Sequence, residues 1–460
     1  MLFSSLGFLY YFLPLVLVLY FLAPDRLKNK VLLLASLIFY GWGEPRLILL
    51  MLISILVHYL LGIRIEEDEE NSKLWLILSI VFQLGLLGYY KYSNFFIDNV
   101  NHIFKTSLPL LKVSLPLGIS FYSFQIMSYT IDVYRKETRA QRSYTDLATY
   151  ISLFPQLVAG PIVRYSQIAE SLKYRQHSLE RLWLGFRRFI LGLAKKVLLA
   201  NLLGEIGLAY SSASANSLVF TWLYAISYTL QIYFDFSGYS DMALGLGQIF
   251  GFDFLENFNY PLSAKSIQDF WSRWHISLST WFRDYLYIPL GGNRVSKKRW
   301  IFNFFTVWFL TGLWHGADWN FIFWGLFFAV FLILEKLYLS VPLERLPSPV
   351  RRIYTLFIVM ISFIIFDSPS LSLAFERIGW LFKINELTTS QSLYLLRSSG
   401  PLVFIGILAA SGLPKKYWQD LKINKKLRGA LEAGSILILL LIVTAYLVDS
   451  AYNPFLYFRF

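Results

Sequence analysis

The 460-residue sequence contains no cysteine. This absence excludes disulfide bridges, thiolate metal ligands and a cysteine nucleophile. Charged residues are also scarce at 15% of the chain, whereas a soluble globular domain is nearer a quarter charged. Hydrophobic residues make up 56% of the chain and the mean hydropathy is +0.51. The composition therefore predicts a protein that resides in lipid.

Long apolar runs recur along the whole chain, from residues 6–23 to residues 436–448. A span needs about 20 residues, so the runs predict an all-α multi-pass membrane protein with about eleven transmembrane helices. We find no internal repeat and expect one integral membrane domain over residues 1–460. Some runs are broken by proline and glycine, which predicts re-entrant helices lining a cavity. The breaking residues are Pro116, Gly118, Pro155, Gly160 and Pro161.

The net charge of +13 raises the alternative of a nucleic-acid partner. The basic residues gather between apolar runs, however, which is typical of cytoplasmic loops. Basic segments lie at residues 135–142, 164–188 and 415–428. We predict that these segments face the cytoplasm and that residues 367–400 and the C-terminus lie outside. No nucleic acid is expected as a partner.

The stretch WSRWHISLSTWFRDY, residues 271–285, concentrates polar and aromatic side chains in an otherwise apolar chain. Helical spacing would place Trp271, His275, Leu278 and Phe282 on one face. Asp269 and Arg273, four residues apart, could form an ion pair. The stretch predicts an amphipathic helix that ends near residues 289–293. The alternative is an interfacial anchor helix whose His275 only makes a hydrogen bond.

A second histidine, His315, lies in TGLWHG within an apolar run over residues 301–334. A titratable group within a span is costly and is a functional candidate by default. Its flanking glycines allow a break in the backbone and close approach of a substrate. The alternative is a buried histidine satisfied by a neighbouring helix. The other three histidines, His58, His102 and His177, lack such surroundings and are interpreted as structural or exposed.

A third stretch, YFDFSGYSDMALGLG, covers residues 233–247 and carries Asp235 and Asp241 among small residues. Such a pattern is also typical of a helix-packing seam. No metal signature is present, since two histidines forty residues apart without a carboxylate framework are weak evidence for a ligand set. No phosphate-binding loop or dinucleotide motif occurs either.

These three stretches occur in order over residues 233–325 and together resemble the membrane-bound O-acyltransferase family, in its alginate O-acetyltransferase branch. The resemblance implies a membrane-spanning tunnel, with His315 as the catalytic histidine and His275 in a supporting role. It also implies a bacterial plasma-membrane location and an extracytoplasmic SGNH-type partner. No bound cofactor is expected, and acetyl-CoA is the expected acyl donor. We predict that the substrate tunnel is lined by Trp271, Arg273, Trp274, Arg283, Asp284, Trp314 and Asp235.

The function predicted is transfer of an acetyl group from a cytoplasmic donor towards an extracellular polysaccharide such as alginate. Direct transfer assisted by the His315 imidazole is preferred, and an acyl-histidine relay is the alternative. D-alanyl transfer to teichoic acid, peptidoglycan O-acetylation and a lipid-linked sugar transporter are the rival functions. The aromatic C-terminal residues 454–460 are predicted to be exposed and to contact the partner, with a headgroup anchor as the alternative.

Overall fold

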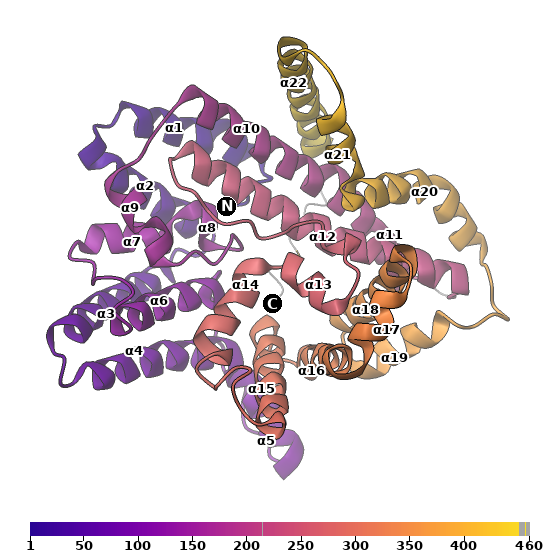
Figure 1. The fold of residues 1–460 in the computed structure, drawn as a ribbon, viewed down its shortest axis with the longest axis horizontal. Helices are drawn as coiled ribbons and strands as arrows, with labels where there is room; N and C mark the ends of the chain where they lie inside the picture. The colour runs from indigo at the N-terminus through magenta and orange to yellow at the C-terminus, as the bar shows by residue number, and fades with distance from the viewer. Residues whose placement is uncertain (214, 450–455, 457–460) are drawn as a thin grey trace. The chain divides into compact units, whose positions relative to one another are not determined.

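The computed structural model describes residues 1–213, 215–449 and 456, and every regular element in these ranges is helical (Figure 1). The predicted all-α class is therefore confirmed for the described chain. The residues divide into two compact units, Met1–Phe189 with Tyr239–Leu255 and Ile190–Gly238 with Glu256–Phe460. Helices α10 (Leu179–Ala194) and α12 (Leu218–Ile249) contribute residues to both. The single-domain organisation stays a prediction.

The first unit is centred on helix α6 (Ile119–Tyr134), in which nearly every residue is buried. Many of these residues are polar, and they pair with the neighbouring helix α4: Gln83 donates to the Ser123 hydroxyl at 2.7 Å. Such pairing lets a polar helix be buried. The other elements are η1 (Phe8–Phe12), α1 (Leu13–Leu22), α2 (Asp25–Gly41), α3 (Ile48–Glu67), α4 (Ser72–Leu87), η2 (Gly88–Tyr92), α5 (Ser93–Phe104), α7 (Tyr144–Ser152), α8 (Phe154–Leu157) and α9 (Tyr165–Lys173).

The acidic run at the end of α3 pairs with a basic loop of the same unit. The Arg142 guanidinium bonds the carboxylates of both Glu66 and Glu67. Lys136 lies 2.7 Å from Glu69. Because these side chains are largely exposed, the pairs fix the loop against α3 and add little to stability.

The second unit contains a close helical hairpin formed by α15 (Lys297–His315) and α16 (Trp319–Leu334) (Figure 1). A Cβ atom on Gly325 would lie 2.2 Å from the carbonyl oxygen of Trp308, so the two backbones touch there. The other elements are η3 (Lys195–Asn201), α11 (Leu202–Ser211), η4 (Pro261–Ser263), α13 (Ile267–Arg273), α14 (Ile276–Phe282), η5 (Arg283–Tyr287), η6 (Glu335–Leu339), α17 (Ser340–Arg345), α18 (Ser348–Asp367), α19 (Leu371–Trp380), α20 (Ser390–Ser411), α21 (Leu413–Asp420) and α22 (Lys425–Asp449).

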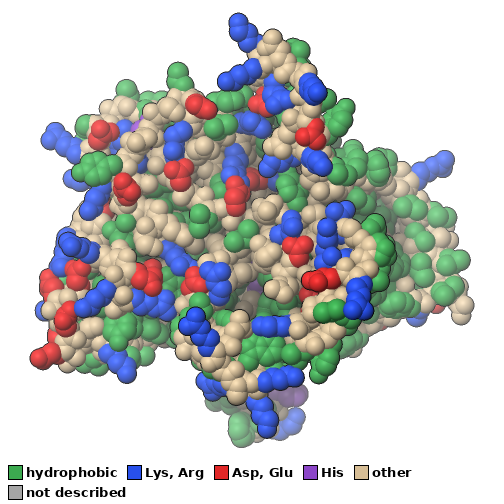
Figure 2. All heavy atoms as spheres, in the orientation of Figure 1, with side chains coloured by type: hydrophobic (Ala, Val, Ile, Leu, Met, Phe, Trp, Pro, Cys, Tyr) green, Lys and Arg blue, Asp and Glu red, His purple; other side chains and the backbone are tan. Residues whose placement is uncertain are grey.

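Six helical segments among the described residues are long and apolar enough to cross a membrane. A shorter apolar segment covers Phe8–Leu22. Their outward faces are apolar, as over α20, where Phe404 is 61% exposed (Figure 2). The figure of about eleven spans stays a prediction. The six segments are Ile48–Glu67, Ser72–Phe104, Trp319–Arg345, Ser348–Asp367, Ser390–Ser411 and Lys425–Asp449.

The predicted continuous helix over residues 271–285 is wrong. Helix α13 ends at Arg273, His275 adopts a left-handed backbone conformation with φ 45°, and α14 begins at Ile276. Helical spacing alone does not reveal such a break, because a non-glycine residue with positive φ is uncommon. The predicted Asp269–Arg273 ion pair does form within α13, at 2.6 Å.

Candidate functional site

The break at His275 is held by the backbone and the side chain of Asn257. The Asn257 carbonyl accepts a hydrogen bond from the backbone N–H of Ile276 at 3.0 Å. Its side-chain oxygen accepts from the backbone N–H and the hydroxyl of Ser277, at 3.1 and 2.9 Å. Asn257 and His275 are both fully buried. A strained backbone persists only where its surroundings fix it, and Asn257 supplies that constraint.

The same contact orients the His275 imidazole. Its Nδ1 atom lies 3.3 Å from the Asn257 oxygen Oδ1. That oxygen is identified by the Ser277 backbone N–H, which can only donate, so Nδ1 must donate as well. The proton therefore lies on Nδ1, and Nε2 is the basic nitrogen. Burial lowers the pKa of His275, so the ring is neutral at physiological pH.

The second histidine, His315, is the last residue of α15 and is 3% exposed. Its ring is surrounded by aromatic side chains in edge-on contact. The Trp324 ring lies 4.9 Å away and the Phe366 ring 5.5 Å away, centroid to centroid. The predicted backbone break after His315 is confirmed, since Gly316 is extended and ends the helix. The imidazole is thus fixed in a dry aromatic enclosure.

Trp314 joins the two histidines. Its indole contacts the His275 ring at 6.0 Å and the His315 ring at 5.0 Å, both edge-on. Phe236 of α12 packs against the other side of His275 at 4.6 Å. Phe236, His275 and the segment Trp314–His315, far apart in sequence, are therefore brought together in the second unit.

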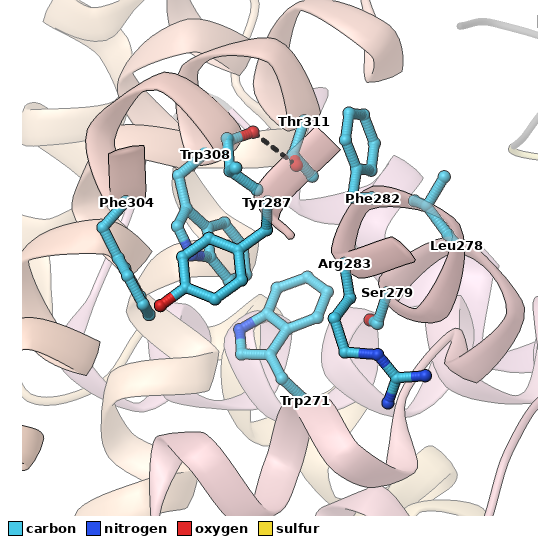
Figure 3. A pocket seen from close by; sticks show the side chains of 10 residues that line it. Trp271, Leu278, Ser279, Phe282, Arg283, Tyr287, Phe304, Trp308 and Thr311 are labelled. Atoms are coloured by element: carbon cyan, nitrogen blue, oxygen red, sulfur yellow. Dashed lines mark hydrogen bonds between the residues drawn. The ribbon is translucent and has the colours of Figure 1, made fainter. Parts of the chain in front are cut away.

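A cavity of about 180 Å³ lies beside this pair, between α14, η5 and α15. Figure 3 shows Trp271 closing one side, with Tyr287 and Trp308 opposite Arg283. We call it the aromatic cavity, after its lining. It contains two of the predicted tunnel residues, Trp271 and Arg283. Its full lining is Trp271, Leu278, Ser279, Phe282, Arg283, Tyr287, Phe304, Val307, Trp308 and Thr311.

A second cavity, of about 170 Å³, has a different chemistry. It lies where α16 begins and α18 ends, and we call it the polar cavity. The Asn320 amide ties the two helices together by donating to the Ser368 carbonyl at 2.9 Å. The Asp367 carboxylate is paired with Arg377 at 3.2 Å, whereas Asp318 is exposed. Its lining is Tyr228, Asp318, Asn320, Phe321, Phe366, Asp367, Ser368, Pro369 and Leu456.

Ring contacts connect His315 to both cavities, through two rings to the aromatic cavity and through one ring to the polar cavity. Trp271 of the aromatic cavity contacts Trp324 at 5.8 Å, and Trp324 contacts His315. Phe366 lines the polar cavity and contacts His315 directly, and its ring also lies 5.2 Å from that of Trp324. The two cavities have no lining residue in common among the described residues. The same imidazole is thus connected to both cavities through one cluster of contacting rings.

The remaining predicted site residues lie elsewhere in this unit. Arg273 is paired with Asp269, and Trp274 stacks on Phe270 in the core at 5.5 Å. Asp284 is paired with its neighbour Arg283 at 2.6 Å. These three residues line neither cavity, and their role at a tunnel wall stays a prediction.

Asp235 was predicted to line the tunnel, yet it lies in neither cavity and is 1% exposed. It forms an ion pair with Lys196 at 2.5 Å. It also accepts a hydrogen bond from the backbone N–H of Leu456 at 2.8 Å. The prediction of an exposed C-terminal tail is wrong at Leu456, which is 5% exposed. The rest of that aromatic segment lies outside the described residues.

Sequence reasoning missed Asn257 and Lys196. Asn257 lies in a loop, where an asparagine gives no particular signal. Lys196, by contrast, lies in the apolar run over residues 182–208. An ionisable residue in such a run is a functional candidate, and that signal could have identified it.

The fold and this paired-histidine site agree with a comparison against known families. Residues 73–373 match the model of the membrane-bound O-acyltransferase family. The chain belongs to this family and is therefore a membrane-resident acyltransferase. The resemblance inferred from the three motifs is confirmed.

Three individual relatives show which members of the family the chain is similar to. The chain is 38% identical to a protein of Azotobacter vinelandii named "Probable alginate O-acetylase", with 100% of both chains covered. A protein of Pseudomonas putida with the same name is 39% identical, again over 100% of both chains. The chain is also 31% identical to a peptidoglycan O-acetyltransferase of Helicobacter pylori, over 100% of this chain and 98% of that protein.

Proposed function

We propose that this acyltransferase moves an acetyl group from a cytoplasmic donor, acetyl-CoA, towards an extracellular polysaccharide such as alginate. The observation that carries the proposal is that ring contacts connect His315 to two chemically different cavities. One cavity suits a donor and the other an acceptor. The names of the full-length relatives favour acetyl as the acyl group and a polysaccharide as the final acceptor.

The aromatic cavity is the donor side in this proposal. Its lining residues come from η5 and α15, and α15 begins in a segment with four basic residues between Arg294 and Arg299. Basic loops are typical of the cytoplasmic face. Arg283 lies at the cavity itself, where a guanidinium can bind a phosphate of the donor.

The polar cavity is the acceptor side. Its lining residues lie at the ends of α16 and α18 opposite their basic loop, which contains Arg345, Arg351 and Arg352. If the basic loop faces the cytoplasm, the polar cavity faces outward. Carboxylate, amide and hydroxyl groups such as those of Asp318 and Asn320 can bind the hydroxyl groups of an acceptor.

The chemistry needs a base and a dry site. The acceptor oxygen attacks the thioester carbonyl, and its proton passes to the His315 imidazole. The carbon–sulfur bond then breaks, and the thiolate leaves as the protonated thiol after taking that proton. The rings of Trp314, Trp324 and Phe366 exclude water that would hydrolyse the donor. A relay through acyl-His315 is the alternative route.

The acceptor in the polar cavity need not be the polysaccharide itself. We propose that an extracytoplasmic SGNH-type partner receives the group and completes the transfer, in a bacterial plasma membrane. D-alanyl transfer and peptidoglycan O-acetylation are the alternatives within the family, and the Helicobacter relative favours the second over the first. A transporter of lipid-linked sugar is disfavoured because the chain belongs to an acyltransferase family.

The test uses sealed inside-out membrane vesicles and labelled acetyl-CoA. We expect the label to be consumed from the outer, formerly cytoplasmic, surface and to appear on glycan when the partner is present. His315→Ala should lower this transfer by about a hundredfold or more while the protein remains folded. His177→Ala, a histidine remote in sequence from the site, is the control and should keep normal transfer. Near-normal transfer by the His315 variant, or consumption only in right-side-out vesicles, would contradict the proposal.

A further inference from the structure

A buried ion pair lies in the second unit, away from both cavities. Lys196 and Asp235 are separated by 2.5 Å, and their side chains are 3% and 2% exposed. Gly238 makes the approach possible, since a Cβ there would lie 3.2 Å from the Lys196 backbone nitrogen and 2.7 Å from the Gly192 carbonyl oxygen. The π-helical turn η3, which carries Lys196, thereby packs directly on α12.

Such a pair needs an explanation other than stability. Removing two charges from water costs as much as their attraction returns, and an apolar pair would often hold the helices equally well. The second carboxylate oxygen of Asp235 suggests another role for the ion pair. It accepts the Leu456 backbone N–H at 2.8 Å, so the charge of Asp235 is shared between Lys196 and the C-terminal segment.

The hydrogen bond between Asp235 and Leu456 connects the ion pair to the polar cavity. Leu456 is 5% exposed and forms part of the wall of the polar cavity. Tyr228, another wall residue, lies seven residues before Asp235 and hence on the same face of α12. The ion pair and the cavity wall are therefore connected through one helix face and one hydrogen bond.

We propose that Asp235, held by Lys196, is a positioning residue that fixes the C-terminal segment at Leu456 as a wall of the polar cavity. Leu456 is in this way a part of the site. The Lys196 ammonium, 2.5 Å from the carboxylate, favours its ionised form and orients it, and an ionised acceptor binds a backbone N–H more tightly than a neutral one. The statement that this wall borders the acceptor rests on the proposed function. The hydrogen bond between Asp235 and Leu456 does not depend on it.

The first test measures position without activity. The chain lacks cysteine, so Pro369→Cys and Leu456→Cys introduce a single pair of thiols, both at the polar cavity. A short bis-maleimide should crosslink them in native membranes. Adding Lys196→Met together with Asp235→Asn removes both charges without leaving one unpaired, and should lower the crosslinking rate about tenfold.

The matched control is Glu205→Gln, which neutralises an exposed carboxylate on α11 and should leave the crosslinking rate unchanged. Equal crosslinking in the control and in the Lys196–Asp235 double variant would overturn the proposal. So would failure of the two thiols to crosslink in the otherwise unaltered chain. Neither result depends on which acyl group or acceptor the protein uses.

The second test removes only the hydrogen-bond donor. Leu456→Pro has no backbone N–H, while Leu456→Ala keeps the N–H and loses the side chain. We expect the proline variant to transfer acetyl to acceptor about tenfold more slowly than the alanine variant. Hydrolysis of the donor, in the absence of acceptor, should be the same in both. Equal transfer by the two variants would overturn the proposal, whereas loss of transfer in the unaltered chain would instead count against the proposed function.

Discussion

Replacing Gly325 by alanine tests how closely the site depends on the α15–α16 hairpin. The added Cβ would lie 2.2 Å from the Trp308 carbonyl oxygen and 3.1 Å from the Gly312 nitrogen. Both neighbours are backbone atoms, so no side chain can move aside. Ordinary contact begins near 3.4 Å, and the helices must therefore separate by roughly 1 Å, an overpacking that typically costs about 1–3 kcal/mol of unfolding free energy.

Separating α15 from α16 would displace residues at the aromatic cavity and at His315. Trp308 lines the aromatic cavity, and Trp324, adjacent to Gly325, contacts His315. A displacement of about 1 Å near reacting groups can lower a rate by about a hundredfold. We therefore expect Gly325→Ala to lower acetyl transfer far more than its loss of stability would require.

The assay is initial-rate transfer of labelled acetyl in membrane vesicles, normalised to folded protein measured by size-exclusion after heating. Gly400→Ala in α20 and Gly434→Ala in α22 are the controls, because nothing lies within 4 Å of the added atom in either case. Both should keep normal transfer and melt no earlier, since alanine favours a helix over glycine. A Gly325 variant with the rate and melting temperature of these controls would refute the argument.

Three further predictions concern the histidine break and the donor. Asn257→Ala leaves the turn at His275 without its side-chain acceptor and should lower the free energy of unfolding by about 1–3 kcal/mol, measured by thermal melting, with the exposed Asn385→Ala as the control. Burial lowers the pKa of His275, so below its unfolded pKa of about 6.5 the unfolded state gains a proton that the folded state does not. The free energy of unfolding should therefore decrease as the pH is lowered from about 7 to about 5, and His275→Asn should flatten that dependence. Arg283→Gln should raise the KM for acetyl-CoA by about tenfold with little change in kcat, and an unchanged KM would remove Arg283 from the donor site.

The features of this site that depend on composition and motif can be predicted from the sequence, whereas those that depend on tertiary geometry cannot. The membrane class and His315 follow from hydropathy and from one histidine in an apolar run. The kink at His275 does not, because it requires a positive φ that only the Asn257 contacts explain. The link between Asp235 and Leu456 joins residues more than two hundred positions apart, and no local pattern encodes it.

The rings around His315 also bear on the electrochemical gradient across the membrane. An energised membrane stores a gradient worth about 2.3 kcal/mol for each charge crossing 100 mV. A water-filled path through this protein would let protons run down that gradient. Trp324 and Phe366 contact the imidazole and each other, and such close ring packing excludes the continuous water that a proton leak needs. Under the proposed function the same rings must separate to admit an acyl group, so between turnovers they would also act as a seal.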